Sequence, residues 1–250
     1  MLSKNTVKFI KSLQQKKFRK QENAFFVEGA KNVTELLQSN FECTHLLFTE
    51  KYDKEFSSLV ASFSNSKIQT SPEVLASLGT FASNDQALAV AKIKPNGSIT
   101  VENGELALAL DDIRDPGNLG TIIRIADWYG IKKLIFSQQT ADIYNPKVLH
   151  ASMGSFTRVD FQYVELKAYL TSSDVPVYGA FLNGKNIHTF QEFRAGILLL
   201  GNESQGISPD LIPFITHQVT IPSFGAAESL NVAVATAVLC DNFRRLQSNF

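Results

Sequence analysis

Polar residues that could take part in catalysis gather at three points where an apolar run gives way to a turn. At the first point, Asn118, Gly120 and Arg124 are spaced N-x-G-x-x-x-R after the run ELALAL and the turn residues Pro116 and Gly117. Asn118 is predicted to cap a helix. On that helix Arg124 lies about 140° from the centre of the apolar stripe, at about 100° per residue. The guanidinium is therefore free to face a polar ligand, although an ordinary surface arginine would fit the same pattern.

The second point follows the apolar run ILLL. Gly201, Asn202, Glu203 and Gly206 place a carboxylate and two flexible backbone positions at the carboxyl end of a predicted strand. Ligands collect at this end of the strands in α/β sheets, and glycine lets the backbone approach a ligand closely. A plain tight turn is the alternative interpretation. No GxGxxG dinucleotide fingerprint stands here, and no GxxxxGK[ST] phosphate loop occurs in the chain.

The third point follows the short run VTIP. Ile221 precedes a glycine turn that leads to Ser229, Leu230 and Asn231, and a long amphipathic helix is predicted over residues 226–246. Small residues along this helix permit close packing against another backbone. Ser229 or Asn231 could simply cap the helix, or the two could belong to a site formed with the first two points.

Positive charge is concentrated at the N-terminus of a chain whose 24 lysines and arginines balance 24 aspartates and glutamates. Seven basic residues precede the first acidic residue, Glu22, and they include Lys16, Lys17, Arg19 and Lys20. Clustered positive charge is suited to contact with a nucleic-acid phosphate backbone. A solvated helix face is the alternative, since some of these residues recur at helical spacing.

The remaining composition excludes several classes of protein. The chain of 250 residues has two cysteines, Cys43 and Cys240, far apart and outside any Cys/His cluster, so neither a disulfide framework nor a metal site is expected. No apolar run approaches the roughly 18 to 20 residues of a membrane span, and the N-terminus lacks a secretory signal. We expect a soluble protein of the reducing cytoplasm.

Apolar runs and helix-like segments alternate along the chain in two blocks. The turn-rich stretch KPNGS separates them, so we predict an N-terminal α/β domain over residues 1–94 and a second domain over residues 99–250. Helices of the first block are expected over residues 30–38, 52–63 and 72–78. In the second block, five apolar runs alternate with helices, which predicts a mostly parallel sheet covered on both faces.

Together the three motifs resemble those of the SpoU/TrmH family of SPOUT RNA methyltransferases. The corresponding residues are Asn118, Gly120 and Arg124 in the first motif, Gly201, Glu203 and Gly206 in the second, and Ile221, Pro222, Gly225, Ser229, Leu230 and Asn231 in the third. A family lysine followed by an S-x-G patch is matched by Lys147, Ser152 and Gly154. Ile113 and Arg114 occupy the variable part of the first motif, and Ala233 stands where many relatives carry serine; both departures bear on the substrate.

The resemblance implies a fold and a reaction. The reaction is methylation of a ribose 2′-hydroxyl in RNA, with ribosomal RNA as the expected substrate, S-adenosylmethionine as methyl donor and no metal. The second domain is expected to contain a deep C-terminal trefoil knot, and the first to be similar in fold to a ribosomal RNA-binding protein. The resemblance also implies a homodimer that pairs through the catalytic domain.

Roles for individual residues follow from the same resemblance. The donor is expected among the loops that contain Gly201, Asn202, Gly206, Ile221 and Leu230. The catalytic residues are expected to be Arg124, Asn118, Glu203, Ser229 and Asn231. Arg124 would act as a cation that holds a phosphate and stabilises the developing alkoxide, and Glu203 could accept the hydroxyl proton. The RNA would be bound by Lys16, Lys17, Arg19 and Lys20.

Three other functions are compatible with parts of this pattern. Transfer RNA could be the substrate in place of ribosomal RNA. The protein could also be a non-catalytic RNA-binding protein on the same fold, although five intact polar motif residues argue against this. A nucleotide-binding oxidoreductase would require a glycine fingerprint that is missing after the relevant strands.

Overall fold

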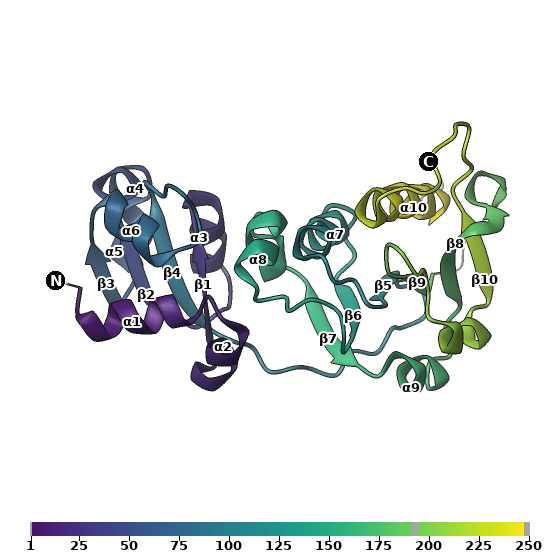
Figure 1. The fold of residues 1–250 in the computed structure, drawn as a ribbon, viewed down its shortest axis with the longest axis horizontal. Helices are drawn as coiled ribbons and strands as arrows, with labels where there is room; N and C mark the ends of the chain where they lie inside the picture. The colour runs from purple at the N-terminus through teal and green to yellow at the C-terminus, as the bar shows by residue number, and fades with distance from the viewer. Residues whose placement is uncertain (1, 192–194, 248–250) are drawn as a thin grey trace. The chain divides into compact units, whose positions relative to one another are not determined.

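The computed structural model describes residues 2–191 and 195–247. Contacts between Cα atoms divide the chain into two compact units, the N-terminal unit (Met1–Pro95 and Asp142–Arg158) and the C-terminal unit (Asn96–Ala141 and Val159–Phe250). Each unit has its own sheet (Figure 1). The segment Asp142–Arg158, which the sequence division assigns to the second domain, packs within the N-terminal unit.

A four-stranded sheet in the order β1-β4-β2-β3 forms the centre of the N-terminal unit. Its strands are β1 (Ala24–Glu28), β2 (Cys43–Phe48), β3 (Ser66–Gln69) and β4 (Ala87–Lys92). Strands β2 and β3 are parallel, whereas β4 runs antiparallel to its neighbours β1 and β2. Every residue of β1 is buried. Because successive side chains of a strand point to opposite faces, both faces of the sheet must be covered at β1.

Helices cover this sheet. They are α1 (Lys4–Ser12), α2 (Lys16–Glu22), α3 (Ala30–Leu37), α4 (Glu50–Glu55), α5 (Ser57–Ser62) and α6 (Pro72–Leu78). Phe26 of β1 joins Ile10 of α1 and Leu75 of α6 in one apolar cluster. The single helix predicted over residues 52–63 is in fact two, because Phe56 leaves the helical conformation at φ −125° and ψ 38°.

Phe25 of β1 packs against the segment Asp142–Arg158. Its ring centroid lies 4.5 Å from that of Tyr144 and 5.9 Å from that of Phe156. All three residues are buried. This aromatic cluster explains why the segment packs with the N-terminal unit.

The S-x-G patch lies in this segment, between α8 (Pro146–Ser152) and the 3-10 turn η1 (Ser155–Thr157). Gly154 has φ +91°, and a Cβ atom there would lie 2.5 Å from Cγ of Glu35 on α3. The Ser152 hydroxyl is buried and donates to the carbonyl of Leu149. The serine and glycine of the patch therefore permit close packing against α3.

Arg19 belongs to the same contact between α2 and the segment Asp142–Arg158. It is 2% exposed, and its guanidinium donates to the carbonyls of Leu13 and Gln14 and pairs with Asp142 at 2.7 Å. A guanidinium enclosed in this way cannot contact an RNA phosphate. The expectation that Arg19 binds RNA is wrong, because a buried structural arginine lies within a run of otherwise exposed lysines.

A six-stranded sheet in the order β10-β8-β9-β5-β6-β7 forms the centre of the C-terminal unit. Its strands are β5 (Ala107–Leu110), β6 (Lys133–Ser137), β7 (Asp160–Val164), β8 (Val177–Asn186), β9 (Ile197–Leu200) and β10 (His217–Thr220). Each neighbouring pair is parallel, which confirms the predicted parallel sheet. The central strands β5 and β9 are buried throughout and contain only Ala, Ile and Leu, as a sheet covered on both faces requires.

Helices lie on both faces of this sheet. Figure 1 shows α7 and α10 on one face, where they pack against each other, and α9 on the other. The helical elements are α7 (Pro116–Trp128), α9 (Leu166–Thr171), α10 (Val232–Gln247) and the 3-10 turns η2 (Ile187–Thr189) and η3 (Pro209–Phe214). None of the described helices has the length and apolarity needed to cross a membrane.

The parallel arrangement places the three motifs at one edge of the sheet. The first motif follows β5, the second follows β9 and the third follows β10. The carboxyl ends of parallel strands meet at the same edge, which is where α/β proteins bind ligands. Residues from three distant parts of the chain can therefore form one site.

We predict that Arg19→Ala lowers the free energy of unfolding by about 3 kcal/mol or more, because it leaves the Asp142 carboxylate without its partner. The neighbouring exposed residue Lys20 provides the control, since Lys20→Ala should change stability by less than about 0.5 kcal/mol. Urea denaturation of both variants measures the difference. Equal midpoints for the two variants would contradict a structural role for Arg19.

Candidate active site

The side-chain amide of Asn118 joins the three motifs. Its Nδ2 donates to Oε1 of Glu203 at 2.7 Å, and its Oδ1 accepts from Nδ2 of Asn231 at 2.9 Å. Glu203 and Asn231 are exposed and Asn118 is half-buried, so this cluster faces solvent. The sequence prediction that these three residues come together is therefore met by direct hydrogen bonds.

The start of α7 orients Asn118. Asp115, and not Asn118, is the N-cap residue: its Oδ1 accepts from the backbone N–H of Asn118 at 2.8 Å, and Pro116 is the first helical residue. The predicted cap at Asn118 is wrong because the helix begins three residues earlier than expected. The Asn118 side chain is thereby left free to contact the other two motifs.

Asn231 connects the cluster to α10. Its Oδ1 accepts from the backbone N–H of Ala233 at 2.9 Å, and its carbonyl accepts from Ala235 at 2.9 Å. The helix begins at Val232, and residues 226–231 form an exposed loop, so the predicted start of the helix at residue 226 is wrong. One amide therefore caps α10 with its oxygen and binds Asn118 with its nitrogen.

The turn after β9 holds Glu203 in place. Asn202 and Gly206 exchange backbone hydrogen bonds of 3.0 and 2.9 Å, and Gly206 has φ +70°. A Cβ atom on Gly201 would lie 2.2 Å from the carbonyl carbon of Gly206, so residue 201 must be glycine in this turn. The tight turn therefore needs both glycines. The Asn202 side chain also ties this turn to the one after β5, since it donates to the carbonyl of Asp112 at 2.9 Å.

Two aspartates that the motif pattern did not single out hold the turn after β5. Asp111 is buried, and its Oδ2 accepts from the backbone N–H of Ser208 at 2.8 Å. Asp112 has φ +58°, and its backbone N–H donates to Oγ of Ser137 at 2.8 Å. The sequence feature that could have identified both aspartates is a pair of acidic residues directly after a buried strand.

Arg124 lies apart from this cluster. It is exposed on α7, as its position opposite the apolar stripe predicted. Six residues separate it from Asn118, which corresponds to about 9 Å along the helix axis and about 120° around it. Among the residues that the structure describes, no hydrogen bond or ion pair involves its side chain. The guanidinium is therefore available to an anionic ligand.

The loop between β10 and α10 offers unpaired backbone groups. In this loop Ile221 is partly buried, whereas Leu230 is 50% exposed and Ser229 is exposed. Within the described part of the chain, the backbone N–H groups of residues 223–231 donate no hydrogen bond. A Cβ atom on Gly225 would meet open space. The loop therefore presents free N–H donors beside two partly exposed apolar side chains.

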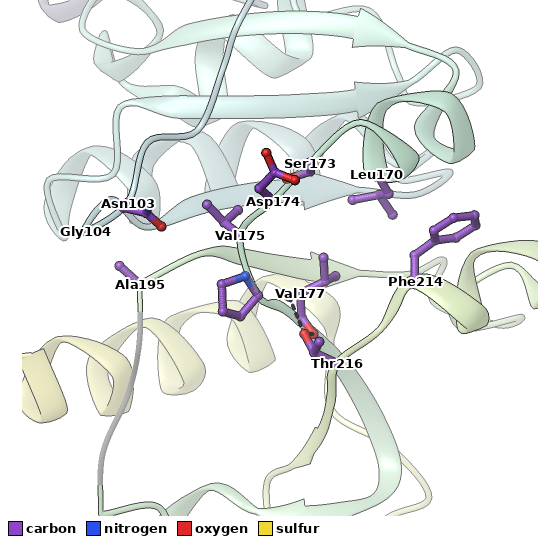
Figure 2. Close-up of a pocket in the computed structure, with 11 residues that line it drawn as sticks. Asn103, Gly104, Leu170, Ser173, Asp174, Val175, Val177, Ala195, Phe214 and Thr216 are labelled. Atoms are coloured by element: carbon purple, nitrogen blue, oxygen red, sulfur yellow. Dashed lines mark hydrogen bonds between the residues drawn. The ribbon is translucent and has the colours of Figure 1, made fainter.

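A cavity of about 700 Å³ lies at the opposite edge of the sheet. Figure 2 shows its lining, which includes Asp174, Val177 and Thr216 at the amino ends of β8 and β10 and Phe214 at the end of η3. None of the motif residues lines it. The cavity is therefore separate from the cluster around Asn118.

The predicted RNA-binding lysines differ from Arg19 in their surroundings. Lys16, Lys17 and Lys20 are exposed on α2, and no ion pair involves them among the residues placed by the structure. They can therefore meet an external polyanion, which the buried Arg19 cannot.

Comparisons with known sequences agree with the motifs. Residues 105–241 match the SpoU rRNA Methylase family, and residues 4–89 match the MRM3-like substrate binding domain. The 23S rRNA (guanosine(2553)-2′-O)-methyltransferase RlmP of Bacillus subtilis is 31% identical over 245 residues, which cover 95% of each chain. The chain belongs to the SpoU rRNA methylase family.

Solved structures extend this likeness to both units. A TrmH-family structure from Porphyromonas gingivalis has a TM-score of 0.84 at 38% identity, with 98% of this chain and 99% of that chain covered. An AdoMet-bound rRNA methyltransferase from Sinorhizobium meliloti has a TM-score of 0.86 at 27% identity, with 98% and 96% covered. The likeness therefore includes the N-terminal unit as well as the motif-bearing unit.

Proposed function

We propose that this protein transfers the methyl group of S-adenosylmethionine to a ribose 2′-hydroxyl of ribosomal RNA. The hydrogen-bonded cluster of Asn118, Glu203 and Asn231 carries this proposal, because it unites the three motifs at the ligand-binding edge of the sheet. The 2′-O-methyltransferase relative from Bacillus subtilis supports the reaction and the substrate class.

The methyl donor fits the loop between β10 and α10 and the turn after β9. S-adenosylmethionine has an adenine ring with polar edges, which suits the free backbone N–H groups of residues 223–231 and the apolar side chains of Ile221 and Leu230. Gly201, Asn202 and Gly206 would bring backbone groups close to the donor from the other side. When bound, the donor supplies an electrophilic methyl group.

The cluster would orient the ribose and take up its proton. Asn118 holds the Glu203 carboxylate through Oε1, and Asn231 in turn holds Asn118. The other carboxylate oxygen of Glu203 has no hydrogen-bond partner among the described residues. That second oxygen would accept the proton of the 2′-hydroxyl while the hydroxyl oxygen bonds to the methyl carbon. The bond between that carbon and the donor sulfur would break, and S-adenosylhomocysteine would leave. Ser229 is exposed beside Asn231 in the sequence and would help to place the ribose.

Arg124 would act as a cation and not as a base. Arginine keeps its proton in proteins, and its five N–H donors suit a phosphate or a developing alkoxide. Its freedom from protein partners leaves all of these donors for the substrate. Arg124 would therefore hold the adjacent phosphate and stabilise charge that develops during transfer.

The N-terminal unit would bind the RNA. Lys16, Lys17 and Lys20 present three exposed cations on α2, and phosphate contacts of this kind need no particular base sequence. We therefore keep the domain assignment of residues 1–94 to substrate binding and 99–250 to catalysis. The segment Asp142–Arg158 packs with the first of these units, and deletion of residues 1–94 would expose its aromatic side chains.

Two further expectations are retained as proposals. The first is the deep trefoil knot, which is supported by the match of residues 105–241 to the SpoU rRNA Methylase family. The second is a cytoplasmic location, which is supported by the free and buried thiols of Cys43 and Cys240. Burial raises the pKa of the Cys43 thiol to about 11 and that of Cys240 to about 12, so both are poor nucleophiles at neutral pH.

Transfer of a labelled methyl group tests the proposed function. The protein is incubated with labelled S-adenosylmethionine and, separately, with ribosomal RNA and transfer RNA from cells that lack the gene. A labelled 2′-O-methylnucleoside is expected after digestion of the ribosomal RNA. Label in transfer RNA alone would reassign the substrate, and the absence of transfer to either RNA would favour a non-catalytic RNA-binding protein.

We predict that Arg124→Ala lowers the single-turnover rate about 100-fold or more, which corresponds to about 2.7 kcal/mol of lost transition-state stabilisation. Stability should change by less than about 0.5 kcal/mol because the side chain is exposed. Arg124→Lys should restore little activity if a bidentate contact is required. An alanine variant with full activity and an unchanged melting curve would remove Arg124 from the mechanism.

We also propose that the protein is a homodimer formed through the face that contains α7 and α10. These helices leave large apolar side chains in solvent: Trp128 of α7 is 83% exposed and Val234 of α10 is 50% exposed. Light scattering at micromolar concentration should give twice the 27.7 kDa of one chain. Val234→Arg should shift the mass toward the monomer, whereas Leu182→Arg, which changes an exposed apolar residue of β8, should not. A monomeric wild-type protein would refute this proposal.

A further inference from the structure

The turn between β5 and α7 holds a guanidinium that the proposed reaction does not yet use. Nε of Arg114 lies 2.7 Å from Oδ1 of Asp112, and the Arg114 side chain is 68% exposed. Its two terminal nitrogens have no hydrogen-bond partner in the part of the chain that the structure describes. The side chain is therefore anchored at Nε while its outer N–H groups face solvent.

Asp112 provides a firm anchor. Its side chain is 15% exposed, and its backbone is in the left-handed region at φ +58°. The backbone N–H donates to the buried Ser137 hydroxyl at 2.8 Å, and the carbonyl accepts from the Asn202 side chain at 2.9 Å. Contacts from β6 and from the turn after β9 thus fix the residue to which Arg114 is bound.

Carboxylates lie close to the turn that contains Arg114. Asp111, Asp112 and Asp115 lie in the turn, and Glu203 lies in the cluster around Asn118. Arg114 is the one basic residue of the sequence between residues 111 and 118. Without it, the carboxylates would repel phosphate groups next to the reacting ribose.

Arg114 also lies within reach of the reacting nucleotide. Four residues separate it from Asn118, so their Cα atoms are at most about 14 Å apart. Both residues follow β5 at the carboxyl edge of the sheet. A phosphate at Arg114 would therefore belong to the target nucleotide or to a close neighbour.

We propose that Arg114, anchored by Asp112, binds a backbone phosphate of the substrate RNA beside the target ribose. This inference rests on the proposed function and adds a phosphate-binding position to its site. Guanidinium groups bind phosphate through parallel N–H···O bonds, and the two outer nitrogens of Arg114 are available for such a pair. Asp112 is a positioning residue, since it acts through Arg114.

The salt dependence of RNA binding tests this proposal. Arg114→Ala should weaken the binding of ribosomal RNA from cells lacking the gene about tenfold or more, the effect of one charged hydrogen bond. The slope of log affinity against log salt should become shallower by about 0.7 to 0.9, as expected for one lost phosphate contact. Affinity for S-adenosylmethionine should stay at its wild-type value, because Arg114 lies outside the loops proposed to hold the donor.

Asp112→Asn tests the anchor. Asparagine tolerates the left-handed conformation, so the turn should be retained while the carboxylate is lost. This variant should weaken RNA binding less than Arg114→Ala does. When Asp112→Asn is already present, adding Arg114→Ala should reduce RNA affinity less than it does in the wild-type protein, because Asp112 acts through Arg114.

Lys132→Ala is the matched control. Lys132 is an exposed cation that directly precedes β6, at the opposite edge of the same sheet, and its removal should leave affinity and slope unchanged. An Arg114→Ala variant with the affinity or the slope of this control would overturn the proposal. If the wild-type protein bound RNA but transferred no methyl group, the proposed function would fail, while the comparison of slopes would still decide the role of Arg114.

Discussion

The candidate site depends on the position of one side-chain amide, that of Asn118. An amide can donate and accept at the same end of a side chain, and Asn118 does both, toward Glu203 and from Asn231. An aspartate in its place could only accept, and it would put a second carboxylate beside Glu203. Each of the three motifs thus supplies one member of a chain of hydrogen bonds whose order is set by donor and acceptor chemistry.

The parallel sheet brings the three hydrogen-bonded residues together, and the backbone on either side of each residue helps to fix its position. Parallel pairing brings the ends of β5, β9 and β10 to one edge of the sheet. Gly201 and Gly206 shape the turn that presents Glu203, and Asn231 is fixed by its place at the start of α10. Side chains that a turn or a helix start already positions lose little conformational entropy when a ligand binds. Such preorganisation favours catalysis.

Much of this arrangement could be predicted from the sequence, because apolar runs and motif spacing are local signals. The runs ALAL and ILLL predicted buried parallel strands, and the motifs predicted the meeting of Asn118 with Glu203 and Asn231. The role of Arg19 could not be predicted, because its partner Asp142 is 123 residues away in the sequence. The start of α10 was also missed, since alanines at residues 226 and 227 favour a helix while the cap is made by Asn231.

A double-mutant cycle on Asn118 and Glu203 tests the central claim that the motifs act through one hydrogen-bonded cluster. Single-turnover methylation rates are measured for the wild-type protein, Asn118→Ala, Glu203→Ala and the double variant, with stability checked by urea denaturation. Residues in direct contact within a network should couple by about 1 kcal/mol or more, so the double variant should be much less impaired than the product of the two single effects. Additive effects on the activation free energy would show that the two residues act independently and would contradict the account.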